Sequence, residues 1–268
     1  MSDFGLARTN QFLLSTAELM LGPSNMVFEL TPSVHSVGLV KNVSCSVQLQ
    51  HTELTQGVAN NLVYSVNTSI DPMIEAEVFE YTARNLAYGA GLEGHNAAFN
   101  PITDSFAIST ALTDASTTVV LAGTGNLTGW NVGDWLVLQD GRGPVIHIAD
   151  VTVVNTTTRT LTINPNKKLP TGITWPVATT RVFRVQSLPL GTQPTMMFGA
   201  KLVGKLPEND EPVVLIFPKV RVVQGFNINF QTDNFASMQF QLKPFALTAA
   251  DPFYSDFSGN RIGRVFRR

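Results

Sequence analysis

Three carboxylates, Glu75, Glu77 and Glu80, form the densest acidic group in the chain. Paired carboxylates are the groups with which glycosidases protonate a glycosidic bond and attack the sugar. A spacing of two residues places Glu75 and Glu77 on the same face of a strand, where neighbouring copies of the chain would repeat them. We therefore favour a solvated stripe over a catalytic pair.

Histidine and cysteine form no catalytic or metal-binding pattern in this sequence. The four histidines, His35, His51, His95 and His147, are far apart, and no HExxH motif is present. The one cysteine, Cys45, falls on the apolar side of a strand pattern, where a thiol is usually a small buried hydrophobe. A reactive thiol would need a neighbouring base, which the sequence does not show. We expect no metal, no cofactor and no enzymatic activity.

The composition indicates a β protein with covered surfaces. Charged residues make up 14% of the 268 residues, against roughly 25% in typical domains. Hydrophobic residues make up 44%, and the net charge is −2, so no basic field would attract nucleic acid. Sheets covered by neighbouring copies fit this composition, and secreted β proteins fit nearly as well. No run approaches the 18 or so apolar residues of a membrane span, and the N-terminus lacks the order of a signal peptide. We expect no membrane insertion and folding in a reducing cytoplasm.

The elements that must position these residues are strands. Residues 226–231 and 238–243 alternate apolar side chains with amides and hydroxyls, which predicts a half-buried antiparallel strand pair. Its polar face carries almost no charge, so we infer that this face meets another copy of the chain.

The first half of the chain contains two predicted strands and one short helix. Residues 37–50 and 62–67 read as strands, separated by a polar loop over 51–61. Asp71-Pro72 is a helix-start signal, yet 73–79 fits a strand equally well. Residues 80–88 favour a helix that ends at Gly89.

The two ends of the chain read as arms. Residues 1–33 show little periodicity and form an N-terminal arm, with a short helix expected around 9–21. Residues 250–268 form a C-terminal arm rich in arginine. We expect its Arg261, Arg264, Arg267 and Arg268 to make salt bridges to an adjacent subunit, with Asp210 and Glu211 as partners.

Residues 104–186 differ from the flanking sequence because they are rich in threonine and contain short strands at regular spacing. This pattern predicts an inserted β-barrel or sandwich of its own. Trp130, Trp135 and Trp175 all fall in this insert. Aromatic side chains in β modules can stack on sugars, although packing in a core is their commoner role.

The order of these parts resembles the tail tube proteins of tailed bacteriophages. The resemblance is carried by VGLVKNVSCSVQLQ (37–50), EAEVFEYTARNLAYGAG (75–91), and the segment from PVVLIFPKV through QLKPFAL (212–247). It covers roughly 130 residues and leaves 104–186 unmatched. A mainly β fold follows: a tail-tube-like β-sandwich or barrel core over 34–103 and 187–249, with one short helix and the inserted β domain.

The resemblance implies hexameric rings that stack into a tube and conduct genomic DNA, with the insert on the tube exterior. Residues of the loop would contact the next ring: His51, Thr52, Glu53, Leu54, Thr55, Gln56 and Gly57. Glu75 and Glu77 would face the lumen, which would hold double-stranded DNA only weakly. The implied partners are further copies of the chain, tail terminator, tail-tip or baseplate and tape-measure proteins. The implied location is the virion, after assembly in the host bacterial cytoplasm.

A second hypothesis is a tail-tip or adhesin-like β protein whose insert binds a host-surface glycan. Glycan binding by residues 104–186 would distinguish it from the tube subunit.

Overall fold

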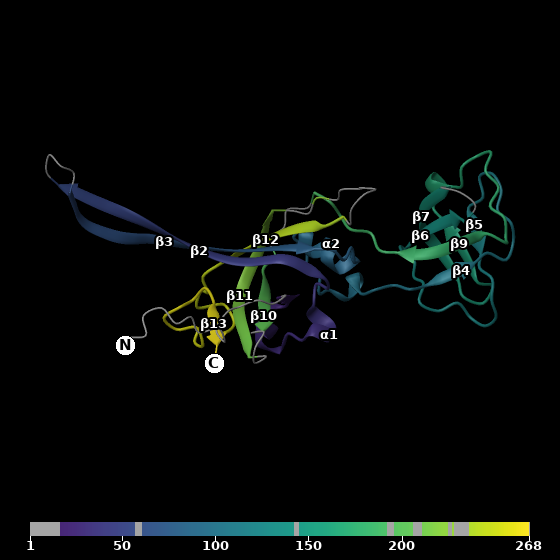
Figure 1. Cartoon of the computed structure of the whole chain (residues 1–268). Helices are drawn as coiled ribbons and strands as arrows, with labels where there is room; N and C mark the ends of the chain where they lie inside the picture. The colour runs from purple at the N-terminus through teal and green to yellow at the C-terminus, as the bar shows by residue number, and fades with distance from the viewer. Residues whose placement is uncertain are drawn as a thin grey trace, which may run out of the picture. The chain divides into compact units, whose positions relative to one another are not determined.

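Two antiparallel sheets account for most of the regular structure in this computed structural model (Figure 1). The structure describes residues 17–56, 61–141, 145–191, 196–205, 211–224, 227 and 236–267. The chain divides into a first unit, Met1–Phe99 with Leu190–Arg268, and a second unit, Asn100–Pro189. The predicted mainly β class is confirmed.

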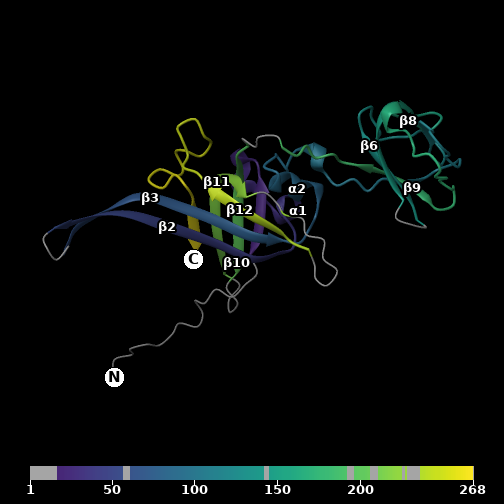
Figure 2. The same ribbon diagram turned by 90° about the horizontal axis from the view of Figure 1, so that it is seen from above.

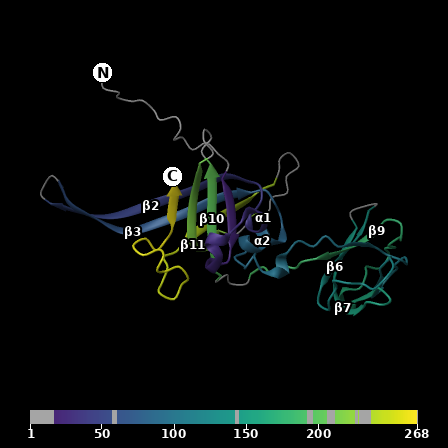
Figure 3. The same cartoon turned by 90° about the horizontal axis from the view of Figure 1, so that it is seen from below.

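The sheet of the first unit combines strands from both ends of the sequence. Its order is β1 (Glu18–Gly22), β10 (Phe198–Lys205), β11 (Pro212–Gln224), β12 (Met238–Pro244), β3 (Asn61–Val78) and β2 (Val40–Gln56). A further strand, β13 (Arg264–Arg267), pairs with the first part of β11. Figures 2 and 3 show β10 and β11 crossing beneath the longer β2 and β3.

Both faces of this sheet are covered near β1 and β10. On one face the helix α2 (Ala83–Gly89) brings Tyr88 against Phe198, with ring centroids 5.1 Å apart. On the other face the 3-10 helix η2 (Ser24–Glu29) and the segment 247–257 enclose a second cluster. The buried residues of that cluster are Met20, Val27, Leu30, Ile216, Leu247 and Phe257.

The predicted helix over 80–88 is present but begins later, at Ala83. Thr82 is its N-cap, because the Thr82 hydroxyl accepts a hydrogen bond from the Asn85 amide at 3.1 Å. The buried Asn85 side chain donates to the Val37 and Glu80 carbonyls, each at 2.8 Å. Two short helical turns also belong to this unit, α1 (Pro32–His35) and η3 (Ala97–Phe99).

The helix predicted around 9–21 is wrong in its described part, where Glu18–Gly22 forms β1. Leu19 and Leu21 enter one core cluster and Met20 enters the other. A strand buried on both faces has a continuous apolar run, which short helices share, so periodicity could not separate the two. Residues 9–16 lie outside the described part of the chain.

Pro218 lies inside β11, where the sequence predicted an edge or a bulge. The register of β10 against β11 shifts between Phe198 and Ala200, opposite Pro218. On its other side, β11 pairs with β13 up to Ile216 and with β12 from Val220 onward. Pro218 therefore occupies an irregular position, where its missing N–H removes no ladder bond.

The second unit is a curled six-stranded sheet whose two ends meet at the isolated bridge Ile108–Leu121. Its strand order is β4 (Ser105–Ala107), β9 (Thr180–Val185), β6 (Trp135–Asp140), β7 (Ile146–Asn155), β8 (Thr160–Ile163) and β5 (Thr118–Val120). Backbone hydrogen bonds join the two edge strands: Ala122 N–H donates to the Ala107 carbonyl and Ser109 N–H to the Val120 carbonyl, both at 2.8 Å. A closed sheet leaves no free edge for pairing.

Candidate functional site

The clearest candidate for an interaction site is the long hairpin of β2 and β3, which extends beyond the other strands of the first unit (Figure 1). We call its outer part, Val47–Gln56 with Asn61–Ile70, the arm. The neighbouring strand β12 pairs with β3 only over Ile74–Val78, so the arm is a ribbon of two strands.

The predicted loop over 51–61 is wrong for its described part. His51–Gln56 continue β2, and each pairs across to β3, ending with Gln56 opposite Asn61. Polar side chains occupy this stretch because a two-stranded ribbon has no core to fill, not because the backbone leaves the strand. Gly57 lies outside the described residues.

Large apolar side chains are exposed all along the arm, with exposed fractions between 44% and 63%. They are Val47, Leu49, Leu54, Leu62, Val63, Tyr64, Val66 and Ile70. An isolated two-stranded hairpin is marginally stable in water, and clustered exposed apolar side chains mark interaction sites. Among the described residues, the arm is therefore a candidate interaction surface.

The apolar side chains change face along the arm. Leu49 pairs with Ile70 near the base, and Leu54 pairs with Tyr64 nearer the tip. Directly paired residues share a face, and side chains alternate along β2. Leu54 and Tyr64 consequently lie on the opposite face from Leu49 and Ile70. The apolar pairs near the tip and near the base are therefore exposed on opposite faces of the ribbon.

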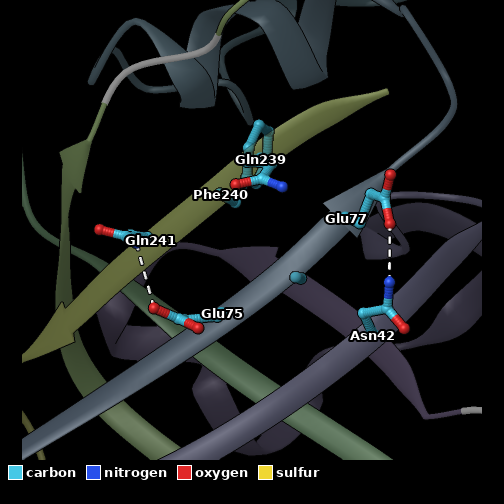
Figure 4. Close-up of a pocket in the computed structure, with 7 residues that line it drawn as sticks. Asn42, Glu75, Glu77, Gln239, Phe240 and Gln241 are labelled. Atoms are coloured by element: carbon cyan, nitrogen blue, oxygen red, sulfur yellow. Dashed lines mark hydrogen bonds between the residues drawn. The ribbon is translucent and has the colours of Figure 1, made fainter. Parts of the chain in front are cut away.

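A second candidate is a polar hollow of about 110 Å³ where β2, β3 and β12 lie side by side (Figure 4). Glu77 accepts hydrogen bonds from the Asn42 amide at 2.8 Å and the Ser237 hydroxyl at 2.5 Å. Glu75 accepts one from the Gln241 amide at 3.1 Å. The hollow is also lined by Gln239, Ala76 and Phe240.

The register explains why these polar groups gather. Gln239 lies opposite Glu77 and Gln241 opposite Glu75, so a row of amides from β12 follows a row of carboxylates on β3. The intervening Ala76 and Phe240 point into the core. The prediction that Glu75 and Glu77 share a strand face is confirmed, and their hydrogen bonds go to amides and a hydroxyl. This face offers hydrogen-bond acceptors to water, and Lys41 of β2 lies opposite Glu77 on the same face.

The arginine-rich end of the chain packs on aromatic rings within its own unit. The guanidinium of Arg261 lies 4.6 Å from the ring centre of Tyr254, and that of Arg264 lies 5.2 Å from Phe257. Arg267 ends β13, opposite Val213. Glu211 is the residue before β11. Arg268 and Asp210 lie outside the described residues, and the expected salt bridges between subunits remain a prediction.

The tryptophans of the insert belong to its core and rim. Trp175 is fully buried and Trp130 is 6% exposed. Trp135 is half-buried, and the Lys167 ammonium lies 4.1 Å from the centre of its ring. Trp130 and Trp175 are thus covered, and Lys167 covers one face of the Trp135 ring.

Two of the remaining titratable side chains have pKa values that are shifted by burial. Burial raises the pKa of the Cys45 thiol and lowers the pKa of the His95 imidazole. Among the described residues, no group of three or more metal-ligating side chains lies together. Within the same part of the chain, no helix is both long and apolar enough to cross a membrane.

No family model matches the chain, and no curated protein matches its sequence. The functional argument therefore rests on the arm and the polar face. Sequence reasoning missed the arm as a structural element, although Leu62, Tyr64 and Val66 already alternate in the sequence. The strand-like segments on the two sides of residues 57–60 have similar lengths, and this similarity could have predicted a long hairpin.

Proposed function

We propose that this chain is a structural subunit of a phage tail tube, which assembles into stacked hexameric rings and conducts genomic DNA. The observation that carries the proposal is the arm, a long two-stranded ribbon with exposed apolar side chains on both faces. Such a ribbon serves assembly, because burying it against another molecule gains free energy that its own unit does not supply.

The edge of the sheet supports the proposal of self-association. β2 is the last strand in the order, and among the described residues no other strand pairs with its outer edge. Unpaired edges invite strand pairing with other chains. A contact between the arm of one copy and a different surface of the next is heterologous, so it repeats into a ring or a filament.

The polar hollow fits the inner wall of a conduit. Its carboxylates, Glu75 and Glu77, repel phosphates, and duplex affinity depends chiefly on lysine and arginine. Lys41 of β2 lies opposite Glu77, with its ammonium 5.0 Å from the ring centre of Phe79, and Lys243 of β12 is paired with Asp71 at 2.8 Å. A wall of this kind would let DNA pass without retaining it.

The adhesin hypothesis is supported less well. Its main feature was the set of tryptophans in the insert, and these are buried or covered by Lys167. The described structure offers no stacked aromatic platform at Trp130, Trp135 or Trp175 for a glycan.

Sedimentation velocity over a concentration series tests the proposal. We expect the wild-type chain to form large assemblies as its concentration rises. Replacing the arm pair, Leu54→Ser with Tyr64→Ser, removes apolar contacts that contribute about 1.5–3 kcal/mol each when fully buried, so at least a tenfold higher concentration should be required.

A matched control replaces two exposed side chains of the second unit, Ile146→Ser with Ile148→Ser, which are 55% and 53% exposed. This variant should assemble like the wild type. Equal assembly by the arm variant would contradict the proposal.

A further inference from the structure

Strand β2 contains a β-bulge beside the polar hollow. Lys41 lies opposite Glu77 and Ser44 lies opposite Glu75, so between these pairs β2 has two residues where β3 has one. Within this stretch Asn42 has a φ of 51°, in the left-handed region. Glycine adopts that region freely, and asparagine tolerates it better than most other residues. Asn42 is therefore the residue that makes the bulge possible.

The extra residue keeps one face of β2 turned to the core. Val40 lies opposite Val78, and Cys45 lies opposite Ile74. Val40, Val78 and Ile74 are buried in one cluster, and Cys45 packs against it. Val40 and Cys45 are five positions apart, whereas Ile74 and Val78 are four apart. Because side chains alternate along a strand, an odd separation gives a shared face only where an extra residue intervenes. The bulge therefore decides which face the following residues of β2 present.

The Asn42 side chain is held across the strand pair. Its amide donates to the Glu77 carboxylate at 2.8 Å (Figure 4). The Ser237 hydroxyl donates to the same carboxylate at 2.5 Å. On its other side, this part of β3 pairs with β12 over Ile74–Val78. The bulge thus lies where β3 is held on both sides, just before the hairpin leaves the other strands.

A β-bulge bends its strand and increases the local twist. β2 and β3 continue beyond this bend as the arm. We propose that Asn42 is the positioning residue of the arm: its left-handed conformation sets the direction in which the arm leaves the sheet and the face that carries Val47 and Leu49. The role of this direction in assembly rests on the proposed function.

Two variants separate the bulge from the asparagine side chain. Deletion of Asn42 removes the bulge, and plain alternation from Val40 then still turns Val43 and Cys45 to the core. Asn42→Gly keeps the left-handed conformation and removes the hydrogen bond to Glu77. Asn42 is exposed, so neither variant leaves a cavity.

Double electron–electron resonance between two spin labels measures the direction of the arm in the monomeric full-length chain. The labels are attached at Asn25→Cys in η2 and Thr52→Cys in the arm, two exposed positions, in a Cys45→Ser background. We expect deletion of Asn42 to shift the distance distribution and Asn42→Gly to leave it unchanged. The control pair, Asn25 with the exposed Gln239 of β12, does not include the arm and should keep its distance in every variant.

Asn42→Val tests the left-handed conformation without shortening the strand. A β-branched residue is strained in that region, whereas glycine is not. The unfolding equilibrium constant of Asn42→Val should therefore be at least about fivefold larger than that of Asn42→Gly. Urea denaturation measures both constants. Equal constants would overturn the assignment of the bulge to Asn42.

The outcomes separate this inference from the proposed function. Deletion of Asn42 should raise the concentration for half-maximal association at least about tenfold, and Asn42→Gly should stay within about threefold of the wild type. A redirected arm with unchanged association would support the positioning role and contradict the part of the arm in assembly. An unchanged arm direction after the deletion would overturn the inference, whether or not rings form.

Discussion

Lys219 of β11 and Asp251 of the C-terminal segment form the most complete ion pair of the first unit among the described residues. The Lys219 ammonium lies 2.8 Å from Oδ1 and 2.7 Å from Oδ2 of Asp251. The amide and hydroxyl of Thr248 donate to the same carboxylate, both at 2.7 Å. This cluster fastens the segment that carries Phe257 and leads into β13.

The Lys219–Asp251 pair predicts a loss of stability in acid. Hydrogen bonds from Lys219, with those from Thr248, lower the pKa of Asp251 to about 2 from its ordinary 3.8. A carboxyl with a depressed folded-state pKa stabilises the fold above its unfolded pKa, and this contribution disappears as the pH falls from about 4 to about 2. Asp251→Asn should cost about 1–2 kcal/mol at pH 7 and less than half of that near pH 2, where the folded carboxyl is about half protonated.

Urea denaturation of the first unit at the two pH values measures this difference. The control is Asp256→Asn, an exposed carboxylate on the same segment. A constant difference between Asp251→Asn and the wild type at both pH values would show that the ion pair is not its source.

Reversing the charge of the polar face should convert it into a DNA-binding surface. Glu75→Lys with Glu77→Lys removes two negative charges and adds two phosphate-binding groups to each copy. We expect the assembled variant to retain duplex DNA. Its affinity should fall steeply with salt, because the slope of log K against log salt concentration is about −0.9 for each phosphate contacted. Filter binding measures it, with Glu75→Gln and Glu77→Gln as the neutral control. Strong retention by the wild type would contradict a passive wall.

The arm should contribute to assembly and not to the stability of the single chain. Leu54 and Tyr64 are 61% and 63% exposed, so their replacement by serine leaves no cavity. We expect the unfolding free energy of the monomer to change by less than about 0.5 kcal/mol. Thermal denaturation at concentrations below association measures this change. A loss of several kcal/mol would place these side chains in the core of the monomer.

The two units should unfold as separate transitions that can be followed by different chromophores. All three tryptophans lie within 100–189 and all four tyrosines lie outside it. Phe240 and Leu136 are fully buried in the first and second core respectively. Phe240→Ala should destabilise the first unit by about 3–5 kcal/mol, and Leu136→Ala the second by about 2–5 kcal/mol.

Tryptophan fluorescence should therefore shift its midpoint in Leu136→Ala and keep it in Phe240→Ala. A single transition that moves equally in both variants would show that the units unfold together.

The strands of the second unit were predictable because each is short, alternating and bounded by turn residues. The expected strands over 135–139 and 159–163 correspond to β6 and β8. Closure of the barrel depends on hydrogen bonds between distant segments, Ala107 with Ala122, and no local pattern encodes such pairing.

The arm was harder to predict because its side chains follow neither the strict alternation of a half-buried strand nor the continuous apolar run of a fully buried strand. Register shifts after Gln50 and after Leu54 add unpaired residues to β3. Polar and apolar side chains therefore mix on both faces, as in a loop. The polar face was easier to predict, because the two-residue spacing of Glu75 and Glu77 places both side chains on one face of the strand. Its amide partners on β12 could not be predicted, because they depend on the order of the strands in the sheet.

Electron microscopy of the purified full-length chain across a concentration series tests the central claim most directly. The tube hypothesis predicts hollow rings with six-fold end views, which stack into tubes as the concentration rises and are lost in the Leu54→Ser, Tyr64→Ser variant. Compact closed trimers without a lumen, formed equally well by that variant, would contradict it.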